Sequence, residues 1–126
     1  MSIGYVTIGA LDVEAALPFY DALLKPMGYE RGPLDGGWAF YGKGDTPGIG
    51  ICPPFDGRPA RAGNGIMIAL RAESHDQVKT AHAAGLANGG TDEGAPGYRP
   101  AEATSGFYGA YLRDPTGNKL CVFKMG

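Results

Sequence analysis

Residues 5–21 read Tyr-Val-Thr-Ile-Gly-Ala-Leu-Asp-Val-Glu-Ala-Ala-Leu-Pro-Phe-Tyr-Asp. Alternating side chains over residues 4–9 predict a short strand, because successive side chains of a strand point to opposite faces. Asp12 then offers an N-cap oxygen, and apolar residues follow at helical spacing. Pro18 is expected to kink this helix or to delay its start, since proline removes a main-chain hydrogen bond.

Short extended segments follow the predicted helix. We expect strands near residues 29–31, 38–41 and 48–52, separated by turns rich in Gly and Asp. Residues 53–64 carry three prolines and no periodicity, which predicts a linker. Residues 1–52 therefore form a first βαβββ module.

The same order returns after the linker. A strand is predicted at residues 66–70, followed by a helix that begins after Ser74. Residues 67–94 align with residues 5–32 at a constant offset of 62 without a gap, and both segments end their helices at glycine. We therefore predict a second βαβββ module at residues 65–126.

Two such modules predict one α+β domain over residues 1–126. A four-stranded sheet cannot bury its apolar face alone, so the two modules are expected to form a curved mixed sheet around a central cleft. The length of 126 residues suits one domain of this kind.

Residues 114–118, Asp-Pro-Thr-Gly-Asn, predict a hairpin turn into the last strand, since proline presets one turn dihedral and glycine permits another. With the opening residues 5–21, this turn resembles the vicinal oxygen chelate superfamily of glyoxalases, bleomycin resistance proteins and extradiol dioxygenases. Residues 24–29 and 94–100 resemble its short bacterial glyoxalase-like branch. The resemblance covers essentially the whole chain and implies a small-molecule site and a homodimer.

Enzymes of that superfamily hold a divalent metal with His, Glu or Gln side chains from the first and last strands of both halves. Carried onto this sequence, these positions fall at Tyr5, Met67 and Cys121, with a fourth near Ile49 or Ile51. None is an imidazole or a carboxylate, so we expect no metal cofactor of the Zn, Ni, Mn or Fe type. Packing of the three side chains is the simpler interpretation, and a Cu(I) site is the alternative.

The predicted cleft is rich in aromatic residues. Its candidate lining residues are Tyr5, Thr7, Trp38, Tyr41, Met67, Arg99, Glu102, Tyr108, Tyr111 and Cys121. Such a lining would suit flat, apolar or cationic ligands. Arg99, Glu102 and Arg113 border a Gly- and Pro-rich loop at 94–106, where they are either pocket residues or solvated charges.

The remaining candidates for chemistry are two histidines and two cysteines. His75 and His82 lie seven residues apart on the second helix, too far apart to share one ion. Cys121 as a nucleophile would need a neighbouring base or cation to lower its pKa. We expect Cys52 and Cys121 to be unpaired, mostly buried thiols.

The charge pattern limits the kinds of partner. The net charge is -2 and the basic residues are scattered, which speaks against nucleic acid as a partner. No apolar run reaches membrane-spanning length and the first residues lack a leader pattern, so we expect a cytoplasmic protein without membrane contact.

Together these observations predict a homodimer that binds a small flat or apolar molecule, with catalytic residues undetermined. The alternative is a metal-dependent lyase, isomerase, dioxygenase or thiol transferase that uses other ligands, such as Glu102 or His82. A purely structural or regulatory role is a third hypothesis.

Overall fold

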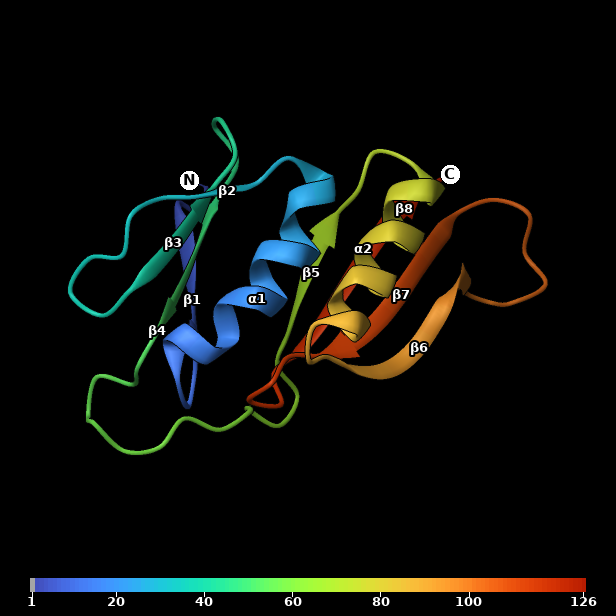
Figure 1. The fold of residues 1–126 in the computed structure, drawn as a ribbon. Helices are drawn as coiled ribbons and strands as arrows, with labels where there is room; N and C mark the ends of the chain where they lie inside the picture. Colours follow the sequence, from blue (N-terminus) through green and yellow to red (C-terminus); the bar gives the residue numbers. More distant parts are fainter. Residues whose placement is uncertain (1) are drawn as a thin grey trace.

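The computed structural model describes residues 2–126 and contains two separate four-stranded mixed sheets (Figure 1). The first half comprises β1 (Tyr5–Gly9), α1 (Val13–Leu24), the short 3-10 helix η1 (Lys25–Met27), β2 (Glu30–Arg31), β3 (Ala39–Gly42) and β4 (Gly48–Cys52). The second half comprises β5 (Met67–Arg71), α2 (His75–Ala87), β6 (Thr91–Tyr98), β7 (Phe107–Arg113) and β8 (Lys119–Met125).

Both sheets have the same strand order. It is β1-β4-β3-β2 in the first and β5-β8-β7-β6 in the second, with the first and last strand of each half parallel. Strand β1 and helix α1 each start 62 residues before β5 and α2, as the sequence offset predicts. The predicted α+β fold of two βαβββ units is therefore confirmed, although the sheets remain two and do not join into one.

Capping residues define where each helix begins. Asp12 accepts a hydrogen bond from the Ala15 amide at 3.1 Å, and Ser74 accepts one from the Gln77 amide at 3.0 Å. Helix α1 starts directly after Asp12 and runs through Pro18, so the predicted late start is wrong. The buried apolar face of this helix outweighs the one hydrogen bond that proline cannot make.

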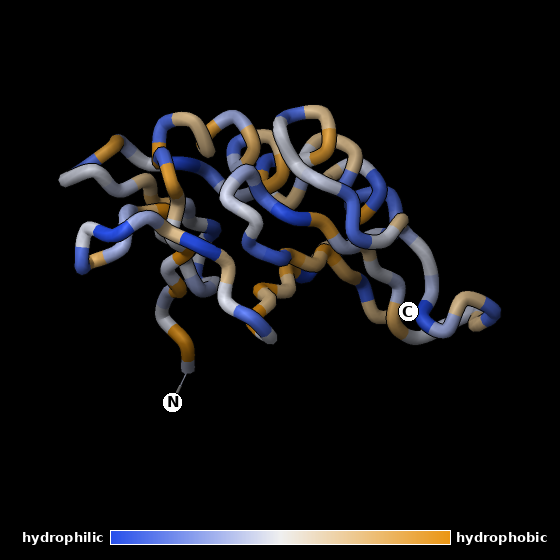
Figure 2. Tube along the Cα trace, turned by 90° about the horizontal axis from the view of Figure 1, so that it is seen from below, coloured by the Kyte–Doolittle hydropathy of each residue, from blue (hydrophilic) through white to orange (hydrophobic). Residues whose placement is uncertain are grey.

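The two helices lie side by side and cover the same side of the two sheets (Figures 1 and 2). Gly85 lets α2 approach both β7 and α1 closely, because a Cβ there would come within 2.6 Å of Leu112 in β7 and 3.3 Å of Phe19 in α1. Neither helix is long and apolar enough to cross a membrane, and no other helix among residues 2–126 is. The cytoplasmic location expected from the sequence stays a prediction.

Strand β6 extends further than the sequence predicts. The stretch 94–106 was expected to be a loop, but residues 94–98 belong to β6 and pair with β7. The pairing register shifts twice, between Asp92 and Gly94 and between Gly94 and Gly97. Strand bulges accept glycine readily, so residues that signal a loop in the sequence mark irregular strand pairing here.

Candidate functional site

Each sheet has one face covered by the helices and one face that no helix covers. The side chains of β1 alternate between these two faces: Ile8 packs on the helix-covered face and is 7% exposed, whereas Tyr5 lies on the opposite face and is 57% exposed. The first helix-free face carries Tyr5, Thr7, Trp38, Phe40, Gly48 and Gly50. The second carries Met67, Arg71, Phe107, Tyr111, Lys119, Cys121 and Phe123.

Two aromatic rings rest on glycines of the first helix-free face. A Cβ at Gly48 would come within 2.5 Å of the Phe40 ring, and one at Gly50 within 3.1 Å of the Trp38 ring. Tyr5 meets Phe40 edge-on, with ring centroids 5.8 Å apart. The glycines therefore let Trp38 and Phe40 lie down on the sheet, and these rings with Tyr5 form an exposed aromatic platform.

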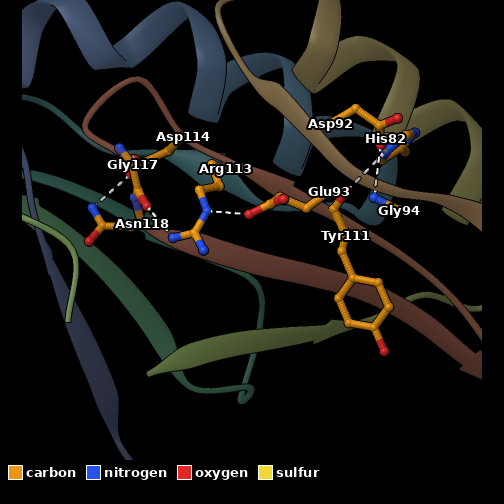
Figure 3. A network of polar contacts seen from close by, with 9 residues as sticks. All are labelled: His82, Asp92, Glu93, Gly94, Tyr111, Arg113, Asp114, Gly117 and Asn118. Carbon is orange, nitrogen blue, oxygen red and sulfur yellow. Dashed lines mark hydrogen bonds and ion pairs between the residues drawn. The ribbon is translucent and has the colours of Figure 1, made fainter. Parts of the chain in front are cut away.

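Tyr111 is the centre of the second helix-free face. Its ring points away from the helices in Figure 3, beside Cys121 in the sheet register. The Arg99 guanidinium lies 5.5 Å from the ring centroid and the Lys119 ammonium 5.3 Å from it. Two of the predicted residues, Arg99 and Tyr111, are thus brought together, and Lys119 joins them.

Tyr41 and Tyr108 require a correction, since both point to the helix-covered side and line neither helix-free face. Tyr41 is 1% exposed, and its hydroxyl donates to Asp21 at 2.7 Å; burial and this bond raise the pKa of Tyr41. Tyr108 stacks on His75 with ring centroids 3.9 Å apart. Both tyrosines are part of the hydrophobic core.

The charged residues of the predicted loop are separated from one another. Glu102 is exposed in the turn between β6 and β7. Arg113 lies in β7, where its guanidinium pairs with Glu93 and donates to the Gly117 carbonyl at 2.8 Å (Figure 3). Arg99 and Arg113 both lie on the second helix-free face, Arg113 opposite Lys119 in the sheet register, whereas Glu102 does not.

The positions that carry the metal in related enzymes do not fit a divalent metal here. Tyr5, Met67 and Cys121 lie on helix-free faces, whereas Ile49 and Ile51 point toward the helices and are buried. A phenol, a thioether and a thiol are not the imidazole and carboxylate set that Zn, Ni, Mn or Fe requires. Among residues 2–126 no three His, Cys, Asp or Glu side chains converge as a metal site would need.

Both histidines are engaged in packing on the helix-covered side. His82 is 5% exposed, and its Nε2 lies 3.1 Å from Asp92 Oδ1 and 3.2 Å from the Tyr111 carbonyl (Figure 3). A hydrogen bond from the Gly94 amide lowers the pKa of Asp92, and His82 adds to this effect. His82 and Glu102 were the alternative metal ligands suggested by the sequence. His82 contacts Asp92 and not Glu102.

Cys121 is a buried thiol, as expected. Burial raises its pKa to about 11, although Arg99 and Lys119 act in the opposite direction. The cations that a nucleophilic cysteine would need are therefore near, but burial outweighs them and the thiol stays protonated at neutral pH. Cys52 is likewise unpaired, and burial raises its pKa.

A groove of about 660 Å³ separates the edge strands β1 and β5 of the two sheets. Its lining is mainly apolar and comes from both halves, with Ile3, Val6, Ile49, Met67, Ile68 and Leu70. Lys43 and Glu73 stand at its rim, 3.8 Å apart. Of the predicted site residues, Met67 alone borders this groove.

The candidate lining residues chosen from the sequence leave out four residues of the helix-free faces: Phe40, Phe107, Arg71 and Lys119. The signal was present, because residues two apart on a strand share a face: Phe40 follows Trp38, and Phe107 precedes Tyr111 by four. The Phe107 ring lies over Gly109 and stacks on Phe123, 5.6 Å between centroids.

Similar proteins are found among solved structures. A glyoxalase/bleomycin resistance protein from Albidiferax ferrireducens T118 is 40% identical, with a TM-score of 0.89 and 98% of both chains covered. No protein-family model matches the chain, and no curated protein matches it.

Two more distant structures share the fold. A glyoxalase/bleomycin resistance protein/dioxygenase family enzyme from Burkholderia phytofirmans PsJN is 18% identical, with a TM-score of 0.74 and 100% of both chains covered. A glyoxalase-related enzyme from Fulvimarina pelagi is also 18% identical, with a TM-score of 0.75 over 98% of this chain and 88% of that chain.

Proposed function

The chain belongs to the glyoxalase/bleomycin resistance protein family, within the vicinal oxygen chelate superfamily, and from this we propose that it binds a small flat molecule without using a metal. The observation that carries the proposal is the aromatic platform of Trp38, Phe40 and Tyr5. These rings are 37%, 41% and 57% exposed. Aromatic surface laid flat on glycines is suited to stacking with a planar ligand.

The loss of metal-binding side chains supports the same proposal. Phenol, thioether and thiol groups at Tyr5, Met67 and Cys121 leave the helix-free faces without a hard cation site. Binding would then depend on stacking and apolar contact, which the platform supplies. Any catalysis would have to use other residues.

We include a homodimer in this proposal. Four large apolar or aromatic side chains near the groove between the two sheets are at least 41% exposed: Ile3, Tyr5, Ile66 and Met67. Neighbouring exposed apolar side chains of this kind are typical of a protein interface. A second copy that covers this surface would enclose the ligand and bury the side chains. Sedimentation at micromolar concentration should give twice the chain mass, and a monomer would contradict this part.

Binding can be tested with Trp38, the one tryptophan of the chain. A planar compound that stacks on the platform should change its fluorescence and raise the melting temperature. Phe40→Ala should weaken binding about tenfold, since stacking contributes roughly 0.5 to 1.5 kcal/mol beyond buried area. Phe55→Ala is the matched control, because Phe55 is fully exposed in the linker. Equal effects of both variants would contradict the proposal.

A second candidate is a metal-dependent lyase, isomerase, dioxygenase or thiol transferase, in keeping with the structural relatives described as enzymes. Elemental analysis of protein purified without chelator separates the two. Stoichiometric Zn, Ni, Mn or Fe that is lost in Glu102→Ala or His82→Ala would favour the enzyme and overturn metal-free binding.

A further inference from the structure

Three cations of the second helix-free face lack a carboxylate partner. Arg71, Arg99 and Lys119 lie on this face, and within residues 2–126 none of them has a carboxylate oxygen within ion-pair distance. Arg113 lies on the same face, opposite Lys119, but its charge is paired with Glu93. The whole chain has a net charge of -2, so this face differs in sign from the molecule as a whole.

Arg99 is fixed in position over the sheet. Its Nη1 donates to the Gly97 carbonyl at 3.0 Å and to the Tyr98 carbonyl at 3.3 Å, and its Nη2 donates to the Ala95 carbonyl at 2.8 Å. A guanidinium has five N–H donors, so two remain for another partner. Because the group is already ordered, a ligand that binds it loses little side-chain entropy.

Glycines in β6 make room for this arrangement. A Cβ at Gly94 would lie 3.2 Å from Arg99 Nη2, and one at Gly97 would lie 3.3 Å from Nη1. Both contacts are tighter than ordinary packing allows. The two glycines thus let the Arg99 guanidinium lie over β6 and against the Tyr111 ring.

Lys119 brings a second cation to the same ring. Its ammonium and the Arg99 guanidinium are 5.3 Å and 5.5 Å from the Tyr111 centroid. Two like charges near one ring repel each other, and the ring quadrupole offsets only part of that cost. An anion that contacts both groups would remove the repulsion and form charge-assisted hydrogen bonds.

We propose that the ligand of this protein is a flat molecule that carries a carboxylate, which Arg99 and Lys119 bind beside Tyr111. The inference rests on the proposed small-molecule binding and specifies the charge of the ligand. Arg71, over the Phe123 ring at 5.8 Å, adds to the positive potential of the face. The aromatic sequence pattern left flat, apolar and cationic ligands open, and this proposal favours a flat anionic one.

The test uses two probes that share one ring system, 2-naphthoate and its neutral amide, 2-naphthamide. Isothermal titration calorimetry on the full chain should show the carboxylate binding at least about tenfold more tightly. Lys119→Gln and Arg99→Gln should each remove most of this preference, by weakening the binding of naphthoate more than that of the amide. Added salt should weaken naphthoate binding alone.

Lys79→Gln is the control, because Lys79 is exposed on α2, away from the helix-free faces. Lys119→Gln keeps the test valid if Arg99→Gln disturbs β6. Equal binding of both probes, unchanged by the two variants, would overturn the carboxylate site and leave small-molecule binding intact. Failure of both probes to bind would overturn the site and count against the proposed function as well.

Discussion

At the scale of the residue, Asp114 makes the densest set of polar contacts in the second half (Figure 3). Its Oδ1 accepts from the amides of Thr116, Gly117 and Asn118 at 2.9, 2.9 and 2.8 Å. Its Oδ2 accepts from Asn118 Nδ2 at 2.9 Å and from the Tyr20 hydroxyl. A carboxylate that is 4% exposed is tolerable because each oxygen has several donors.

Asp114→Ala should therefore destabilise the protein by about 3 kcal/mol or more, since several donors lose their acceptor while buried. Urea unfolding followed by circular dichroism measures the change. Asp56→Ala is the matched control: Asp56 is exposed in the linker and accepts one amide hydrogen bond, from Arg58. A loss below 1 kcal/mol for Asp114→Ala would show that the turn is held by other contacts.

The face on which a residue lies could be predicted where strand parity was respected. Tyr5 and Thr7, two apart, share the first helix-free face. Trp38 and Tyr41 are three apart and so cannot both face the same way on one strand. Arg99 was a candidate because it borders the Gly- and Pro-rich stretch 94–106, but its contact with Tyr111 could not be predicted, since it depends on how β6 bulges at two glycines.

At the scale of the element, strands β3 and β4 build the aromatic platform together. Gly48→Ala and Gly50→Ala should displace the Phe40 and Trp38 rings, since the new methyl groups would overlap them. Ring displacement should shift the emission of Trp38 in Gly50→Ala and weaken binding of planar probes in both variants. The rings can swing outward, so stability should fall by only about 1 kcal/mol.

Gly42→Ala provides the comparison within the same sheet, because a Cβ at Gly42 meets nothing within 4 Å. It should leave both the emission of Trp38 and the binding of planar probes as they are. If Gly48→Ala and Gly42→Ala behave alike, close approach of the rings is not the reason for glycine in β4.

Elements were predicted well where both halves repeat one pattern. The strand and helix starts of β1, α1, β5 and α2 follow from the 62-residue offset, and the linker lies between β4 and β5. Strand β6 was the exception. Two glycines and a proline interrupt its sequence, and only pairing with β7 shows that it continues to Tyr98.

At the scale of the whole molecule, buried phenols and a thiol make the fold sensitive to alkali. Burial, with Asp114 nearby, raises the pKa of Tyr20, and burial raises the pKa of Tyr41 and of Cys121, the last to about 11. The folded state therefore keeps protons that the unfolded chain releases, so the stability from these groups is complete below about pH 8.5 and is lost as the pH rises.

The free energy of unfolding should accordingly decrease between about pH 9 and pH 11, as measured by urea titrations at fixed ionic strength. Tyr20→Phe should flatten part of this decrease, because it removes one ionisable group from the core. A stability that stays constant up to pH 11 would contradict the assignment.

The relative placement of the halves could not be read from the sequence. It depends on packing at Gly85 between α1 and α2 and on long-range bonds from the Asp114–Asn118 turn. Asn118 Nδ2 donates to the Gly9 carbonyl at 2.9 Å, and the Leu11 amide donates to Thr116 Oγ1 at 3.1 Å. No local pattern indicates contacts across more than a hundred residues.

The contact that the Asp114–Asn118 turn makes with the other half has an equivalent in the first half, as a duplicated chain would predict. The β7–β8 turn of the second half touches the β1–α1 loop of the first half, and the β3–β4 turn, through Lys43, reaches Glu73 in the β5–α2 loop. Such reciprocal contacts are what two copies of a half-length ancestor would make around a two-fold axis. The two contacts are unequal in strength: the first belongs to a buried network around Asp114, whereas the second is an ion pair at 3.8 Å with an exposed carboxylate. The Asp114 end should therefore hold the two halves together more firmly than the Lys43 end.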